Sequence, residues 1–127
     1  MKLNALVAAS LLILGTGAAA SSAPLRPLVR GWERYFKLDW EAGMRGDRPA
    51  VTGHIFNDGG FAATRIRLLV ETLDASGQVV SQTEDWLPGM LTPGMRAFFE
   101  VPVPQRAAEY RVSVFAFEWL PRGKGVL

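Results

Sequence analysis

Hydrophobic and polar residues alternate along much of the chain after residue 34. In residues 35–41 (YFKLDWE) aromatic and aliphatic side chains alternate with charged ones, and the same period of two recurs in residues 63–73 (ATRIRLLVETL). Such alternation is typical of a strand with one buried face. Together with β-branched and aromatic content elsewhere, it predicts six strands: residues 35–41, 50–57, 63–73, 79–86, 95–103 and 110–120.

Turn-forming residues fill the gaps between these segments. Residues 57–60 (NDGG) are the strongest turn signal, Asp74 is placed to accept a backbone hydrogen bond two residues on, and Pro93-Gly94 fits the centre of a type II turn. Gly53 marks a candidate bulge, and Pro102 favours a sheet edge for the strand that contains it. The pattern predicts an all-β fold, a single antiparallel immunoglobulin-like β-sandwich of about six to seven strands.

One segment also fits a helix. Residues 32–41 (WERYFKLDWE) would place Trp32, Tyr35, Phe36 and Trp40 on one helical face, so a helix stays open as the alternative there. For residues 63–73 a strand is preferred, because their β-branched side chains alternate and a turn cluster lies at each end.

The first twenty residues have the features of a secretory signal peptide. Lys2 precedes an uncharged apolar run, and Ala18 and Ala20 occupy the small-residue positions before the expected cleavage. The expected organisation is a signal peptide (1–20), a linker or irregular lead-in (21–34), a sandwich domain (35–120) and a C-terminal tail (121–127). We therefore expect a periplasmic or secreted protein with no membrane span after cleavage; an uncleaved N-terminal anchor is the alternative.

The amino-acid composition excludes several kinds of binding and catalytic site. The 127 residues contain 14 Lys and Arg against 12 Asp and Glu, and this net charge of +2 without a basic block argues against a nucleic-acid partner. There is no Cys, which excludes disulfide scaffolds, Cys-ligated metals and thiol catalysis. His54 is the single histidine, so a multi-histidine metal site is impossible. No metal or cofactor is expected.

The order of these features resembles the FxLYD-type domains and related immunoglobulin-like modules of the bacterial envelope. The resemblance covers about residues 36–119. Its marks are a strand ending at Asn57, the alternating residues 66–70, the D-x-x-G turn at residues 74–77, and Leu91-Thr92-Pro93-Gly94 followed by an aromatic strand. Where the eponymous motif would fall, residues 70–74 read VETLD and keep only the Asp. The resemblance implies a non-enzymatic envelope module and carries over no functional residue.

The chain lacks the signatures of common enzymes. No G-x-S-x-G motif presents a serine, and a hydrolytic triad would have to use His54. Asp39 and Glu41 would share one strand face, which is more typical of a solvated surface than of a catalytic pair. We predict that the protein is not an enzyme.

The last strand carries the candidate contact residues. Simple alternation puts Phe115, Phe117 and Trp119 on one face, with Arg65 and Arg67 as candidate polar neighbours. Either this stripe is exposed and docks a partner, or the N-terminal segment covers it, or the strand switches faces at a bulge. The leading hypothesis is contact with another envelope protein. The alternative is a binding module for a small apolar or glycan ligand.

Overall fold

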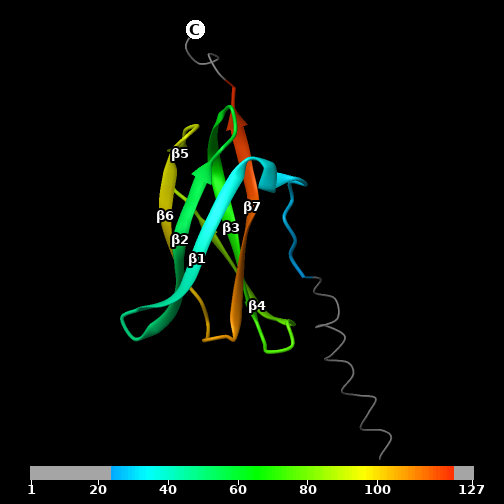
Figure 1. Cartoon of the computed structure of the whole chain (residues 1–127), viewed down its shortest axis with the longest axis vertical. Coiled ribbons are helices and arrows are strands. Elements are labelled where there is room, and N and C mark those ends of the chain that lie inside the picture. The colour runs from blue at the N-terminus through cyan, green and yellow to red at the C-terminus, as the bar shows by residue number, and fades with distance from the viewer. Residues whose placement is uncertain (1–23, 122–127) are drawn as a thin grey trace, which may run out of the picture.

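The computed structural model describes residues 24–121. These residues form seven strands in two antiparallel sheets, which face each other in a sandwich-like arrangement (Figure 1). The predicted signal peptide and most of the predicted tail lie outside the described residues. Among the residues described, no helix has the length and apolar character needed to cross a membrane.

The first sheet, sheet A, has the order β1-β2-β6. Its strands are β1 (Phe36–Arg45), β2 (Arg48–Asn57) and β6 (Arg96–Pro102). The edge position predicted for β6 from Pro102 is confirmed. The gap between the predicted strands 35–41 and 50–57 is too long, because pairing continues to Arg45 opposite Arg48 and only two residues make the turn.

The second sheet, sheet B, is built around β3 (Ala62–Leu73). On one side β3 pairs with β7 (Glu109–Leu120) along most of its length; on the other it pairs with β4 (Val79–Trp86) and the short β5 (Met90–Leu91). Strand β5 was not predicted, because two residues between two Pro-Gly breaks carry no readable alternation.

The helical alternative for residues 32–41 is wrong beyond its first turn. Trp32–Arg34 form a single 3-10 turn, η1, and the chain enters β1 at Phe36. Phe36 lies opposite Asn57 on β2, and its side chain is almost completely buried. The core contact and the backbone pairing of β1 outweigh the local helical pattern.

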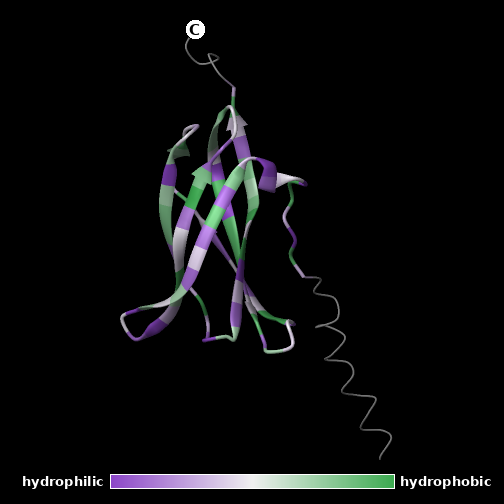
Figure 2. Ribbon diagram, in the orientation of Figure 1, coloured by the Kyte–Doolittle hydropathy of each residue, from purple (hydrophilic) through white to green (hydrophobic). Residues whose placement is uncertain are grey.

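The hydrophobic core lies between the two sheets. Apolar and polar residues alternate along the strands in Figure 2, as expected for sheets with one buried face. Apolar side chains that are almost completely buried in this core come from both sheets: Phe36, Val51, Ile55, Leu68, Val70, Val101 and Val114. Burial of this cluster supplies the main favourable term for folding.

Two of the predicted turns are confirmed in detail. The Asp74 carboxylate accepts hydrogen bonds from the backbone N–H groups of Ser76 and Gln78, both at 2.9 Å. Gly94 has φ +83°, and the N–H of Met95 donates to the Thr92 carbonyl at 3.0 Å, as a type II turn requires.

Gly53 was predicted to mark a bulge, and this is wrong. The pairing of β1 with β2 runs through Gly53 without a register shift. A Cβ at this position would lie 1.9 Å from the Asp39 carbonyl oxygen. Gly53 therefore allows β1 to approach β2 more closely than any side chain would permit.

Candidate functional site

Strands β3 and β7 contain two bulges that change which residues face the core. The pairing shifts between Thr64 and Arg67 and again between Arg67 and Leu68, so that Phe115 on β7 has no partner of its own. Val112 and Val114 face the core before this point, and Phe117 and Trp119 pack against it afterwards. The inferred faces of the last strand are therefore wrong beyond Val114, because a bulge reverses the alternation.

Phe117 and Trp119 belong to an aromatic cluster that closes one end of the core. The Trp119 ring stacks on Phe36 with centroids 5.7 Å apart, and it meets the edges of Tyr35 and Phe117 at 5.2 and 4.9 Å. Phe115 is also buried, at 6% exposure. The three aromatics therefore do not form one exposed stripe. The two alternatives that the sequence left open are both present: the N-terminal segment covers part of the strand, and a bulge switches its faces.

The two candidate arginines have different surroundings. Arg65 has φ +52°, sits at the β3 bulge and faces solvent, where its guanidinium lies 3.6 Å from the Glu118 carboxylate. An exposed pair of this kind contributes little to stability. Arg67 instead lies over the ring of Phe115, at 5.0 Å from its centroid. The structure thus joins Arg67 with Phe115 and leaves Arg65 outside that cluster.

Arg67 also contacts Trp86, an aromatic residue that was not among the candidates from the sequence. Its guanidinium lies 4.8 Å from the Trp86 ring centroid and donates to the Glu84 carboxylate at 3.0 Å. The Trp86 side chain remains 56% exposed. The sequence held no clear signal for Trp86, because Val80 falls in the same alternation and the contact with Arg67 is set by strand pairing. We name Trp86, Arg67, Glu84 and Phe115 the Trp86 cluster.

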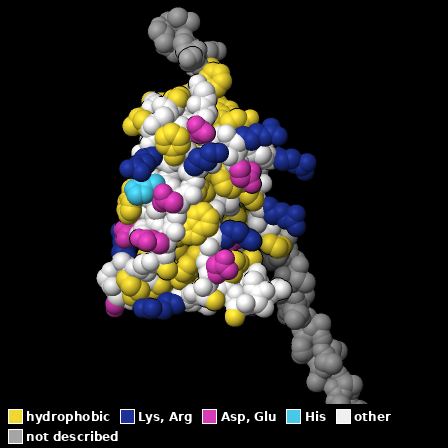
Figure 3. Space-filling view, in the orientation of Figure 1, with side chains coloured by type: hydrophobic (Ala, Val, Ile, Leu, Met, Phe, Trp, Pro, Cys, Tyr) yellow, Lys and Arg dark blue, Asp and Glu magenta, His cyan; other side chains and the backbone are white. Residues whose placement is uncertain are grey.

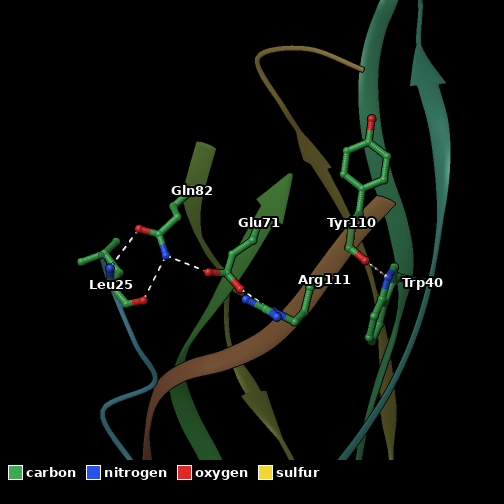
Figure 4. Close-up of polar contacts among 6 residues, drawn as sticks. All are labelled: Leu25, Trp40, Glu71, Gln82, Tyr110 and Arg111. Carbon is green, nitrogen blue, oxygen red and sulfur yellow. Dashed lines mark hydrogen bonds and ion pairs between the residues drawn. The ribbon is translucent and has the colours of Figure 1, made fainter. Parts of the chain in front are cut away.

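An irregular segment of the chain crosses the same face of sheet B. Residues 24–30, named the strap below, form neither helix nor strand and precede η1. The Leu25 backbone exchanges two hydrogen bonds with the Gln82 side-chain amide, at 2.9 and 3.0 Å (Figure 4). The Leu28 N–H donates to the Phe115 carbonyl at 2.8 Å. The predicted linker is therefore docked on the sheet.

A nearly buried carboxylate lies beneath the strap. Glu71, with a side chain only 8% exposed, accepts hydrogen bonds from Arg111 at 2.7 Å and from Gln82 at 2.8 Å. The hydrogen bond to Glu71 raises the pKa of Arg111 above its ordinary value and outweighs the opposing effect of burial. The two donors replace the hydrogen bonds to water that the carboxylate loses on burial. Without such partners, a buried charge would strongly destabilise the fold.

The strap and Trp40 together cover the outer edge of β7. The Trp40 indole N–H donates to the Tyr110 carbonyl at 3.0 Å (Figure 4). With the bond from Leu28 to Phe115, two outward-facing backbone carbonyls of this edge strand are satisfied. Covering an edge in this way prevents it from pairing with other chains.

A groove remains between the strap and sheet B. Its volume is about 580 Å³, and its walls include Trp32, Trp40, Leu69 and Val112 together with the Glu71–Arg111 pair. The strap therefore bridges the sheet without filling the space beneath it.

The outer face of sheet A carries the single histidine. His54 and Asp39 lie opposite each other on β2 and β1, with His54 Nδ1 3.4 Å from an Asp39 carboxylate oxygen. They line a shallow hollow of about 310 Å³ with Thr52 and the exposed ring of Phe98. Figure 3 shows charges of both signs mixed over this face. Within residues 24–121, no three His, Asp or Glu side chains gather closely enough to hold a metal ion.

The chain was compared with known families, curated proteins and solved structures. No family model, no curated protein and no solved structure matches it.

Proposed function

We propose that this protein is an exported, non-enzymatic module of the immunoglobulin-like class that acts by protein–protein contact in the bacterial cell envelope. The proposal places it in the periplasm or outside the cell, in keeping with the leader expected from the sequence. Its partner is another envelope protein, and the contact is made by the outer face of sheet B.

The Trp86 cluster is the observation that carries this proposal. Trp86 exposes more than half of its surface, yet Arg67 stacks against it and is itself fixed by Glu84 and Phe115. Trp and Arg dominate the binding energy of many protein interfaces. Side chains that are already held in place lose less conformational entropy when a partner binds. A rigid, exposed Trp–Arg pair on a sheet face therefore suits protein contact.

The test is cross-linking in intact cells, comparing Trp86→Ser with Phe98→Ser. Both residues are exposed aromatics, but Phe98 lies on the outer face of sheet A. We expect one dominant cross-linked partner that is lost with Trp86→Ser and retained with Phe98→Ser. Equal capture by both variants, each shown to be folded by circular dichroism, would contradict the proposed surface.

A second candidate function is supported by the groove under the strap. Its volume is within the range of small-molecule sites, and Trp32, Trp40 and Leu69 offer apolar walls. The ligand would be a small apolar molecule or a glycan. Saturable binding by the isolated chain that is lost with Trp32→Ala, and unchanged by Trp86→Ser, would favour this function over protein contact.

A hydrolytic triad would have to use His54, because no other histidine is present, and Asp39 is the carboxylate beside it. Thr52 is the hydroxyl residue that lines the same hollow. A turnover that vanishes with His54→Ala in a folded protein would overturn the non-enzymatic proposal.

A further inference from the structure

The strap is held mainly through its backbone. Gln82 contacts both the N–H and the carbonyl of Leu25, and Phe115 accepts from the N–H of Leu28 three residues on. The Leu25 and Leu28 side chains are 37% and 66% exposed. A site that reads backbone groups at a fixed spacing can accept other extended peptides, as strand-adding recognition domains do.

The Gln82 amide is oriented by the buried pair beneath it. Glu71 only accepts hydrogen bonds when ionised, so the amide must turn its nitrogen toward that carboxylate. The Gln82 oxygen then points to the Leu25 N–H, and the second hydrogen of the nitrogen points to the Leu25 carbonyl. Arg111 fixes Glu71 in turn. The whole row is arranged to bind the backbone N–H and carbonyl of one residue (Figure 4).

The attachment of the strap is weak compared with that of a strand. Three hydrogen bonds join it to sheet B, Leu25 and Leu28 remain 37% and 66% exposed, and the groove of about 580 Å³ lies beneath it. Segments with few buried apolar contacts open at low free-energy cost. Opening would uncover the Gln82 amide and the Phe115 carbonyl, which both need new partners.

We propose that the strap is an internal ligand of a peptide-binding site, and that an extended segment of a partner protein replaces it there. The partner segment has the chemistry of the strap: a free backbone N–H and carbonyl at one aliphatic residue, a second free N–H at an aliphatic residue three positions later, and a basic residue and a proline between them. The inference rests on the proposed function, because it names the site and the kind of segment through which that protein contact is made.

The test opens the strap in the full chain by the double substitution Leu25→Pro and Leu28→Pro. Proline lacks the N–H group, so both donors of the strap backbone are removed while the rest of the protein is unchanged. A fluorescent peptide with the sequence of residues 23–31 is titrated against each protein and followed by anisotropy. We expect saturable binding to the double variant and at least about tenfold weaker binding to the unmodified chain, where the tethered strap competes.

Two controls separate this site from unspecific association. Adding Gln82→Ala to the double variant should abolish the binding, whereas Thr83→Val, the next residue on β4, should not change it. A peptide with proline in place of Leu25 should bind more weakly than the native peptide, because it lacks the N–H that Gln82 accepts.

Each contrary outcome overturns the inference. One is a lack of peptide binding in a double variant whose strap has opened, as shown by faster trypsin cleavage after Arg30 than in the unmodified chain. A strap that stays as resistant to cleavage after Arg30 as in the unmodified chain contradicts the weak attachment. Dimerisation of the double variant, reversed by the peptide, would make a second copy the occupant instead of a partner protein. None of these results affects the cross-linking comparison of Trp86 and Phe98, so the two proposals can fail separately.

Discussion

Gly53 shows how a single residue can control the distance between two strands. Its Cα faces the backbone of Asp39 and Trp40, and an added Cβ would fall 1.9 Å from a carbonyl oxygen. We expect Gly53→Ala to lower the free energy of unfolding by about 1–3 kcal/mol, the range for overpacking a filled site. The measurement is the midpoint of urea unfolding.

Gly43 supplies the matched control for this substitution. It also lies in a strand of sheet A, but the nearest atoms to its added Cβ are 3.9 Å away, on Thr52. Gly43→Ala should leave the unfolding midpoint nearly unchanged. Equal effects of the two substitutions would show that the backbone at Gly53 relaxes away from the contact.

Asp74 links stability to pH through the turn between β3 and β4. The hydrogen bond from the Ser76 hydroxyl, followed by that from the Gln78 N–H, lowers the pKa of Asp74 below its ordinary value of 3.8. A carboxyl with a lowered pKa stabilises the fold above the unfolded-state value and loses that contribution as the pH falls through the folded-state value. Asp74→Ala should therefore destabilise the protein at neutral pH and much less in acid.

Ser76→Ala gives an independent check on this pH dependence. It removes the largest cause of the shift and leaves the backbone donors in place. The pKa of Asp74, followed by NMR titration of its carboxyl carbon, should rise toward the ordinary value in this variant. An unchanged titration would show that the hydroxyl does not hold the carboxylate.

At the scale of elements, β7 joins the core through two different sets of side chains. Trp119, after the bulge, packs on Phe36, Phe117 and Tyr35. We expect Trp119→Ala to cost about 3 kcal/mol of stability, the lower end for removing a buried aromatic, because the ring is partly exposed. Thermal unfolding followed by circular dichroism measures this loss.

Trp86→Ala is the matched substitution on the solvent side of the same sheet. Its ring lies against Arg67 but is 56% exposed, so the expected cost is about 1 kcal/mol or less. A larger loss at Trp86 than at Trp119 would reverse the assignment of which aromatic is structural and which is available for contact.

Alternation along the sequence was enough to place most strands. Residues 79–86 have the predicted bounds, and Ile66, Leu68 and Val70 are buried together as expected. The faces of β7 beyond Val114 were wrong, because a bulge depends on the pairing of two strands and leaves no mark in one of them. Trp86 was missed for a related reason: its neighbour Arg67 is nineteen positions away, at a cross-strand contact that only the register defines.

At the scale of the whole molecule, the strap and the sheets should differ in local stability. The amides of Leu25 and Leu28 depend on one hydrogen bond each at an exposed segment, whereas Val70 lies within the central strand of sheet B. We expect the two strap amides to exchange with deuterium at least about a hundredfold faster than the Val70 amide. Hydrogen exchange followed by NMR would test this, and equal protection would mean that the strap opens only with global unfolding.

The two bulges between β3 and β7 cancel each other. Across the β3–β7 pair, β3 inserts one residue near Arg65 and β7 inserts one at Phe115, so that the pairing beyond both points has the same offset as before them. They behave like a pair of compensating frameshifts. Losing either residue alone would shift one end of the pair by a position and turn its buried side chains toward water. Losing both would restore the match, so homologous chains should gain or lose these two positions together during evolution.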